Sequence, residues 1–348
     1  MEISYVGSQM RHLGEKRNLS GVPDTARFVD CSVVPANVCH PENRNPFSAN
    51  AAISDVFLKP LRGFNDVSQI EYVGTATYNG LQAQLNRRYT KGFQYGIAYT
   101  YSKTLDNSKD DDTGDVFYGR PYHLFNHSVA DFDQTHIFTA NYIWDIPSPS
   151  GFLKHILGNW QASGTTSLVS GKPKTLGTSG TTLFVTYNAN TTTPTGGKCP
   201  AGFSLTLPTQ CTAVTDLTGG EVNARPNMIC DPNVGATGTT GNGVPYLINT
   251  SCFTRPGIGN IGNMRRNSVR LPGLVVTDLA VFKNFQMTEK TTLQFRWETY
   301  NLFNHTNFKD IDGNMRFNAD GSQTNSNFGA PISAAPPRIM QGSLRFSF

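Results

Sequence analysis

Apolar and polar residues alternate along several stretches of this chain. The clearest two are residues 79–89 and 93–101, which a short link separates. In the second stretch aromatic or aliphatic residues such as Phe93, Tyr95 and Ile97 occupy every second position, with small or polar residues between them. Successive side chains of a β-strand point to opposite faces, so this period of two predicts strands with one apolar and one polar face. The pair is expected to form a hairpin.

The same alternation predicts six further strands, at residues 1–8, 136–146, 159–170, 274–285, 291–303 and 338–348. Short or moderate links alternate with long ones. The former are residues 90–92, 147–158 and 286–290, and the latter are 9–77, 104–135, 171–273 and 304–337. Short turns at one rim and long loops at the other are typical of outer-membrane barrels. We therefore predict an all-β fold: a transmembrane antiparallel outer-membrane β-barrel, partial, with about eight strands and long extracellular loops.

The polar side of the predicted strands bears on the environment of the sheet. Arg296 and Glu298 lie on the same face of one strand, beside Gln294. In a barrel this face meets a hydrated interior and the apolar face meets lipid. In a soluble β-sandwich, such as a secreted lectin or enzyme, the polar face is exposed to solvent and the apolar face packs on a second sheet. A small self-contained barrel that acts as an adhesin or surface anchor is a further alternative.

The composition favours strands and loops over a globular enzyme. Charged residues make up 16% of the chain, against roughly a quarter in typical soluble domains. There are 13 Tyr and 22 Phe, and no apolar run is long enough for a membrane helix. The net charge is +4 and the basic residues are scattered, so no nucleic-acid partner is expected.

Residues 1–8 lack the basic start and apolar core of a signal peptide and already have the pattern of a strand. We therefore expect residues 1–348 to be the C-terminal part of a longer barrel, without its signal peptide.

The cysteines fall in the long predicted loops. None of them forms a C-x-x-C pair of the kind that binds zinc. Disulfides are typical of the periplasm and the cell surface, and neighbours in the sequence suggest one set of pairs, although other pairings and reduced thiols remain open. The suggested pairs are Cys31–Cys39, Cys199–Cys211 and Cys230–Cys252.

The chain ends on an alternating strand with an aromatic last residue. Leu344, Phe346 and Phe348 share one face of it. This ending resembles the signal by which the barrel-assembly machinery recognises outer-membrane proteins. Physically, it is an edge strand that is available to pair with another strand.

Longer stretches resemble the barrel terminus of TonB-dependent receptors, and within them the Oar-like group. The matching stretches are residues 293–308 (LQFRWETYNLFNHTNF), 338–341 with Phe348, 78–82 (YNGLQ), 99–106 (YTYSKTLD) and 2–8. The resemblance implies a much larger barrel closed by an N-terminal plug, uptake of a large solute (carbohydrate, peptide or siderophore-like), and energy from the TonB complex. The plug and the TonB contact have no counterpart here, so TonB would act only through a missing N-terminal region. The resemblance places the protein in the outer membrane of a Gram-negative bacterium, in contact with its lipid.

Candidate chemistry is sparse. Residues 106–115 are rich in Asp but lack the distal Glu of a calcium loop. His123, His127 and His136 belong to no H-E-x-x-H motif, and G-x-S-x-G does not occur. Residues 257–262 match G-x-G-x-x-G without a βαβ unit around them, which favours a plain loop. We predict no enzyme activity, catalytic residue, cofactor or metal, and the sequence identifies no substrate-binding residue.

Overall fold

The structure is a computed structural model of the chain. It describes residues 1–29, 31, 36–47, 53–107, 126–149, 158–177, 218–221, 224–257, 259–288, 291–315, 323 and 325–348. Strands dominate these segments. None of the helices within them combines the length and the apolar character that crossing a membrane requires.

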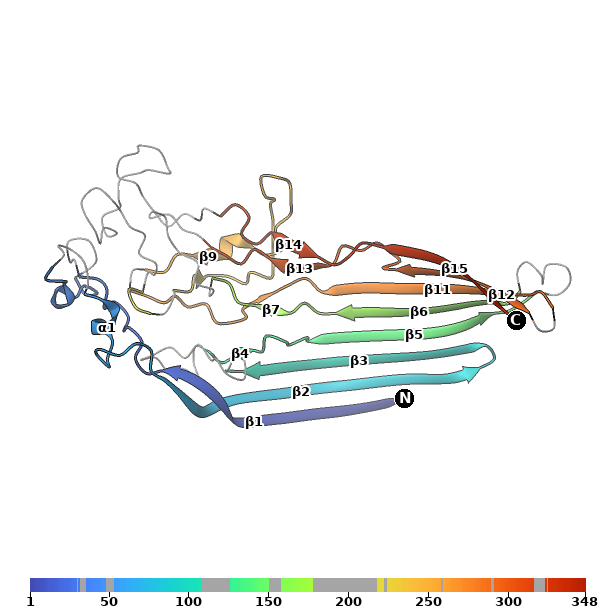
Figure 1. Ribbon diagram of the computed structural model, residues 1–348, viewed down its shortest axis with the longest axis horizontal. Coiled ribbons are helices and arrows are strands. Elements are labelled where there is room, and N and C mark those ends of the chain that lie inside the picture. The colour runs from blue at the N-terminus through green and yellow to red at the C-terminus, as the bar shows by residue number, and fades with distance from the viewer. Residues whose placement is uncertain are drawn as a thin grey trace.

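Eight long strands form one antiparallel sheet in which each lies beside the next long strand of the chain (Figure 1). They are β1 Glu2–Asn18, β2 Ser68–Thr90, β3 Phe93–Asp106, β5 His136–Ile146, β6 Trp160–Val169, β11 Leu274–Gln286, β12 Thr292–Tyr300 and β15 Ile339–Ser347. A short strand, β4 Ser128–Val129, joins the same sheet beside β3. The predicted strands and the all-β antiparallel class are confirmed.

The register of the sheet brings the apolar sides of neighbouring strands onto one face. A row across it runs through Ala83, Tyr99, Phe138, Leu168 and Val275, each opposite the next. A shift of one residue between any two of these strands would move a whole apolar set to the other face, so the alternation itself specifies the register.

A polar row crosses the opposite face of the sheet. It runs through Asn86, Gly96, Asn141, Thr165 and Asp278, again with each residue opposite the next. A Cβ added to Gly96 would lie 3.1 Å from the side-chain amides of both Asn86 and Asn141. The glycine thus leaves room for two amide side chains to meet over it.

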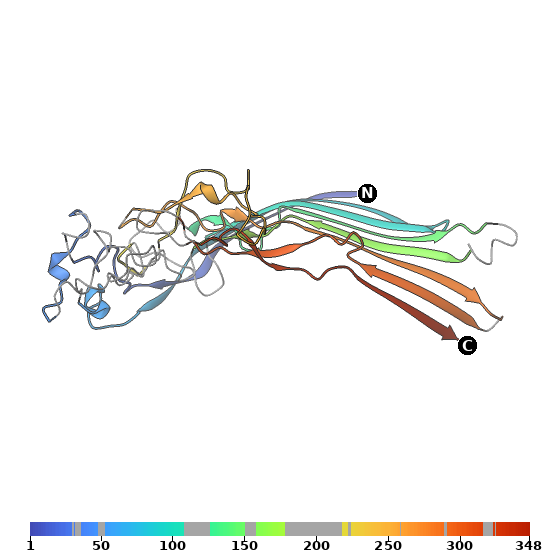
Figure 2. The same ribbon diagram turned by 90° about the horizontal axis from the view of Figure 1, so that it is seen from above.

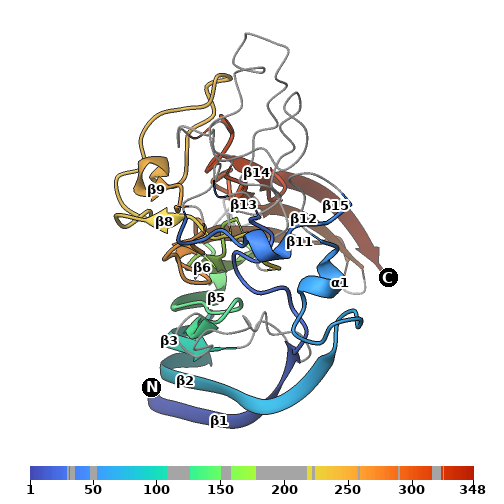
Figure 3. The same ribbon diagram turned by 90° about the vertical axis from the view of Figure 1, so that its left-hand side faces the viewer.

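The connections divide the molecule into two ends. The tight turn between β2 and β3 and the C-terminus lie at one end, and the segments between β1 and β2, β3 and β5, β6 and β11, and β12 and β15 lie at the other (Figure 1). The predicted alternation of short and long links is confirmed. Seen end-on, the strands form an arc with β1 and β15 at its two ends (Figure 3). These two strands do not pair with each other in the described sheet.

The predicted strand bounds were wrong at the loop end of β1 and β2. β1 has 17 residues and β2 has 23, so the paired strands extend into both ends of the expected loop at 9–77, as far as Asn18 and back to Ser68. Two register shifts flank Leu13, and His12 has a φ of 59°. Such bulges insert a residue and break the period of two, which hid the strand from the alternation. A membrane-spanning strand needs only about 9–11 residues, so this hairpin projects well beyond the bilayer.

The long segments fold into a cap with its own short elements. These are η1 Pro41–Asn43, α1 Asp55–Leu58, β7 Pro173–Lys174, β8 Asn227–Met228, η2 Thr250–Cys252, β9 Phe253–Thr254, β10 Val269–Arg270, β13 Phe308–Ile311 and β14 Pro331–Ala334. Its strands pair as β10 with β7, β13 with β14 and β8 with β9. The sequence predicted these segments only as loops, because their elements are too short to show a period.

The hydrophobic core of the described residues lies in this cap. Its main cluster includes Leu176, Met264, Ile311 and Phe328, drawn from the segments before β11 and before β15. By contrast, apolar side chains of the long strands stay exposed, such as Tyr5 at 69%. A sheet whose apolar face is not covered by the described residues, attached to a cap with a hydrophobic core, is the arrangement expected when lipid covers that face.

Two disulfides lie in the cap. Cys31 bonds to Cys39 and Cys230 to Cys252, with Cα–Cα distances of 5.2 and 4.9 Å. These are two of the three pairs suggested by sequence proximity. Cys199 and Cys211 lie outside the described residues.

Candidate functional site

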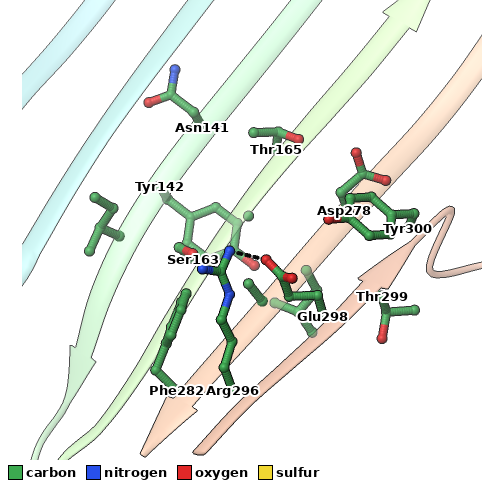
Figure 4. A pocket seen from close by; sticks show the side chains of 14 residues that line it. Asn141, Tyr142, Ser163, Thr165, Asp278, Phe282, Arg296, Glu298, Thr299 and Tyr300 are labelled. Carbon is green, nitrogen blue, oxygen red and sulfur yellow. Dashed lines mark hydrogen bonds and ion pairs between the residues drawn. The ribbon is translucent and has the colours of Figure 1, made fainter. Parts of the chain in front are cut away.

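A groove of about 320 Å³ opens on the sheet across β5, β6, β11 and β12, with apolar and polar groups in its lining (Figure 4). Its polar lining comes from side chains that point to the same side of these strands. They are Asn141, Ser163, Thr165, Asp278, Arg296, Glu298 and Tyr300. The alternation of residues predicted Arg296 and Glu298 on one face of their strand but not the groove, because its other members come from strands far apart in the chain.

Asn141, Thr165 and Asp278 are successive members of the polar row, so hydrogen bonding between strands fixes their spacing. Asp278 also accepts a hydrogen bond of 2.9 Å from the backbone N–H of Asn301, where the chain leaves β12. This contact secures the end of β12 against β11. The groove therefore presents amide, hydroxyl and carboxylate groups on a rigid backbone.

Arg296 and Glu298 form an ion pair on β12, which Figure 4 shows as a dashed line. Gln341 of β15 donates a hydrogen bond to the other carboxylate oxygen of Glu298. The guanidinium carbon of Arg296 lies 5.0 Å from the centroid of the Phe282 ring, within cation–π range. These contacts hold both charges in place and balance them, which leaves the Asp278 carboxylate as a further negative charge in the groove.

A buried network of charged groups ties the cap to the sheet. Arg266 pairs with Asp106 at the end of β3 and lies 3.7 Å from Asp131. Arg270 pairs with Asp133, whose carboxylate also accepts a hydrogen bond of 2.6 Å from the backbone N–H of Thr104. The network joins the segment after β3 to the segment before β11.

Asn267 adds contacts between the same two segments, and Lys174 connects a third. Its side-chain amide donates to the carbonyl of Val129 at 2.7 Å, and its amide oxygen accepts from the Thr175 hydroxyl at 2.9 Å. Nearby, Lys174 pairs with Asp310 and donates to the carbonyl of Ile311 at 2.7 Å. Three of the long segments are thereby fastened together over one end of the sheet.

The family model of the outer membrane beta barrel domain matches residues 1–341. The chain belongs to the outer membrane beta barrel family. No curated protein and no solved structure matches it significantly. The protein therefore localises to the outer membrane, as predicted. In a barrel of this family the apolar face of the sheet is the lipid face, the polar face with its groove is the interior face, and the long segments are extracellular.

The predicted assembly signal of this outer-membrane barrel lies on β15, an edge of the sheet. Leu344 and Phe346 stand opposite Phe295 and Leu293 on the lipid face, and they are 69% and 57% exposed. The ring of Phe348 lies 6.0 Å from that of Phe346. The structure thus places these three residues together at an accessible edge.

The other sequence motifs that fall within the described residues do not form a cluster of metal ligands. No group of three or more His, Cys, Asp or Glu residues in the described part of the chain could hold a metal ion. His136 contacts Tyr99 and Tyr101, while His123 and Asp110, Asp111, Asp112 and Asp115 lie outside the described residues.

The described residues of the G-x-G-x-x-G match, 257 and 259–262, form a loop. The backbone N–H of Arg225 donates to the carbonyl of Ile261 at 2.7 Å, and Gly262 has a φ of 79°. Gly262 permits the close approach of the backbone at Arg225, which explains this glycine without a bound nucleotide.

Proposed function

We propose that this chain is the C-terminal part of the barrel of a TonB-dependent outer-membrane receptor of the Oar-like group. The intact receptor takes up a large solute, such as a carbohydrate, a peptide or a siderophore-like compound. The chain itself contributes part of the barrel wall, part of the interior surface and the extracellular cap, and it carries no catalytic residue, cofactor or metal.

The observation that carries this proposal is the open arc of the sheet. β1 and β15 each pair on one side only, and the interior face holds an accessible groove. An eight-stranded barrel closes on itself around an interior just wide enough for its side chains to fill. A wide arc with a wet groove fits a segment of a larger barrel, which encloses a lumen for a solute.

The cap supports capture of a solute outside the cell. Its segments contain a hydrophobic core, two disulfides and the ion pairs of Arg266 and Arg270 with buried carboxylates. A surface that is ordered before binding pays less conformational entropy when a ligand arrives. The cap is thus suited to present binding groups above the lumen.

Three partners follow from this role. The lipid of the outer membrane contacts the apolar face, and the barrel-assembly machinery binds the open edge of β15 with Leu344, Phe346 and Phe348. The TonB complex engages the receptor through a region that precedes these residues. No contact with nucleic acid is part of this function.

Neighbouring residues of β6 provide a test of the wide interior. Thr165 lies on the interior face and Thr166 on the lipid face. We expect Thr165→Cys, but not Thr166→Cys, to react with a hydrophilic biotin maleimide in isolated outer membranes. Protection of both cysteines would indicate a filled interior and would favour the small adhesin-like barrel.

The TonB link needs a separate test, with the protein produced from its complete gene in its own host. We expect it to co-purify from solubilised outer membranes with the periplasmic domain of TonB. Failure to do so, with a known receptor of that host captured in the same experiment, would remove the TonB assignment and leave the barrel.

A further inference from the structure

A row of small residues forms the floor of the groove on the interior face. Ser163 of β6 stands opposite Ala280 of β11. The larger side chains of Ile143 and Glu298 continue the row on either side, opposite Ser163 and Ala280 respectively. The hollow shape thus follows from side-chain size on four adjoining strands. Because backbone hydrogen bonds join these strands, the hollow is formed before any ligand arrives.

Uncharged groups that form hydrogen bonds lie beside this floor. Asn141 stands opposite Thr165, and Gly96 leaves room for the amides of Asn141 and Asn86 to meet. Gln94 lies on the same face of β3, two positions before Gly96. The side chains of Asn86, Gln94, Asn141 and Thr165 are all exposed. Amides and hydroxyls both donate and accept hydrogen bonds, which makes them good partners for the hydroxyl groups of a ligand.

The charges that line the groove disfavour an anionic ligand. Among the described residues of the lining, Arg296 is the only cation, and it is paired with Glu298. Gln341 donates a further hydrogen bond to Glu298. Asp278 adds a negative charge, so an anion would have to separate the ion pair and approach a carboxylate. A neutral ligand would do neither.

An exposed aromatic ring stands at the loop end of the groove. Tyr300 is the last residue of β12 and is 43% exposed. Since Leu279 stands opposite Thr299, Tyr300 is next to Asp278 across the two strands (Figure 4). A tyrosine ring offers an apolar surface, and the carboxylate beside it accepts hydrogen bonds. A sugar ring matches this combination, because it has C–H groups on its faces and hydroxyls at its edge.

We propose that this groove binds a neutral sugar unit of an oligosaccharide and selects such solutes over charged ones. The inference rests on the proposed function, because it assigns a substrate class to the interior face of the receptor. Asn141, Thr165 and Asp278 form hydrogen bonds with sugar hydroxyls, and the ring of Tyr300 packs against the C–H face. The groove volume of about 320 Å³ is at the small end for ligand sites, so the groove holds part of a larger solute.

The test uses the full-length protein, extracted from outer membranes and labelled with a fluorophore. It is applied to an array of neutral oligosaccharides, oligosaccharides with uronic acid or sulfate groups, and oligolysine peptides. We expect the protein to be retained on neutral oligosaccharides and not on the charged molecules. The dissociation constant of the neutral oligosaccharide that binds best is then measured by isothermal titration calorimetry in detergent.

Substitutions in the groove should weaken this binding. We expect Asn141→Leu, Thr165→Val and Tyr300→Leu each to raise the dissociation constant about three- to tenfold, as the loss of one hydrogen bond or ring contact does. Thr166→Val is the matched control, because it makes the same change on the lipid face of β6. It should bind as the parent protein does, and circular dichroism checks that every variant keeps its strands.

Asp278→Asn tests the selectivity of the groove. This substitution keeps an oxygen that can accept the Asn301 N–H and removes the negative charge. We expect it to narrow the preference for neutral oligosaccharides over those with uronic acid groups.

Three results would overturn the proposal: retention on no neutral oligosaccharide, equal or better retention on the charged molecules, or equal losses for Thr165→Val and Thr166→Val. Failure of the receptor assignment is a separate outcome. Loss of TonB capture, with binding of a neutral oligosaccharide retained, would remove that assignment and leave the sugar site. Retention on charged molecules alone, with TonB capture intact, would remove the sugar site and leave the receptor.

Discussion

Asp106 and Arg266 form an ion pair across 160 positions of the sequence, with 11% and 7% of their side chains exposed. The pair joins the last residue of β3 to the segment that leads into β11. It is one of the contacts that hold the long connecting segments together as a cap.

Removal of one partner of this pair should loosen the cap. We expect Arg266→Ala to destabilise the protein by about 3–5 kcal/mol, because it leaves the Asp106 carboxylate buried without its cation. Thermal unfolding in detergent and limited proteolysis of the segment before β11 would measure the effect. Arg296→Ala, in an exposed pair, serves as the comparison and should change the unfolding temperature little. A similar response to both substitutions would contradict the anchoring role of Arg266.

Gly262 should resist replacement. Its φ is 79°, and an added Cβ would lie 1.9 Å from the carbonyl oxygen of Arg225. We expect Gly262→Ala to cost at least about 1–3 kcal/mol from the backbone conformation alone. Gly241→Ala is the control, because an added Cβ there meets nothing within 4 Å. Urea unfolding would measure the free energy of unfolding of both variants. An unchanged free energy for Gly262→Ala would show that the two loops do not approach as closely as described.

The two faces of β11 should respond oppositely to charge. Val281 lies on the lipid face, opposite Trp297, and Ala280 on the interior face, opposite Glu298. We expect Val281→Arg to destabilise the barrel by about 2–4 kcal/mol, since a cation near the centre of the bilayer is poorly solvated. Ala280→Arg should fold into vesicles almost as stably as the parent protein. Equal costs in a urea titration of the vesicle-inserted variants would mean that the faces are assigned wrongly.

The acid sensitivity of the cap should depend in part on Asp55. Its hydrogen bond to Arg27, followed by their charge attraction, holds the pKa of Asp55 below its ordinary value of 3.8. A carboxyl group whose pKa is lower in the folded than in the unfolded protein stabilises the fold at pH values above its unfolded-state pKa. This contribution is lost as the pH falls through its folded-state pKa. The pair is partly exposed, so its contribution is at most about 1 kcal/mol.

We therefore expect Asp55→Asn to lower the unfolding temperature slightly at pH 6 and not at pH values below the depressed pKa. Thermal scans of the parent and variant proteins across this range would reveal the difference. A gap between the two proteins that persists in strong acid would indicate that Asp55 acts by packing rather than by charge.

The alternation of residues determined the strands of this protein, their order of short and long links, and the residues of each face. Tyr99, Phe138 and Leu168 belong to the apolar sets of their strands in the sequence, and they meet in one row of the sheet. The period of two is local information, and the burial of one face in lipid leaves only one compatible register.

Where the alternation of apolar and polar residues is interrupted, the sequence no longer predicts the strands. The extension of β1 beyond Ser8 was missed because the bulges around Leu13 interrupt the alternation. The cap core of Leu176, Met264 and Phe328 was missed because its elements are two to four residues long or irregular.

The pairing of Arg266 with Asp106 and the groove between Asn141 and Arg296 were decided only by the tertiary structure. Each brings together residues whose positions in the chain carry no periodic relation. Their proximity depends on the order of strands in the sheet and on how the long segments return over it. Sequence alone specifies a face by local geometry, whereas contacts between distant segments depend on the free energy of the whole fold.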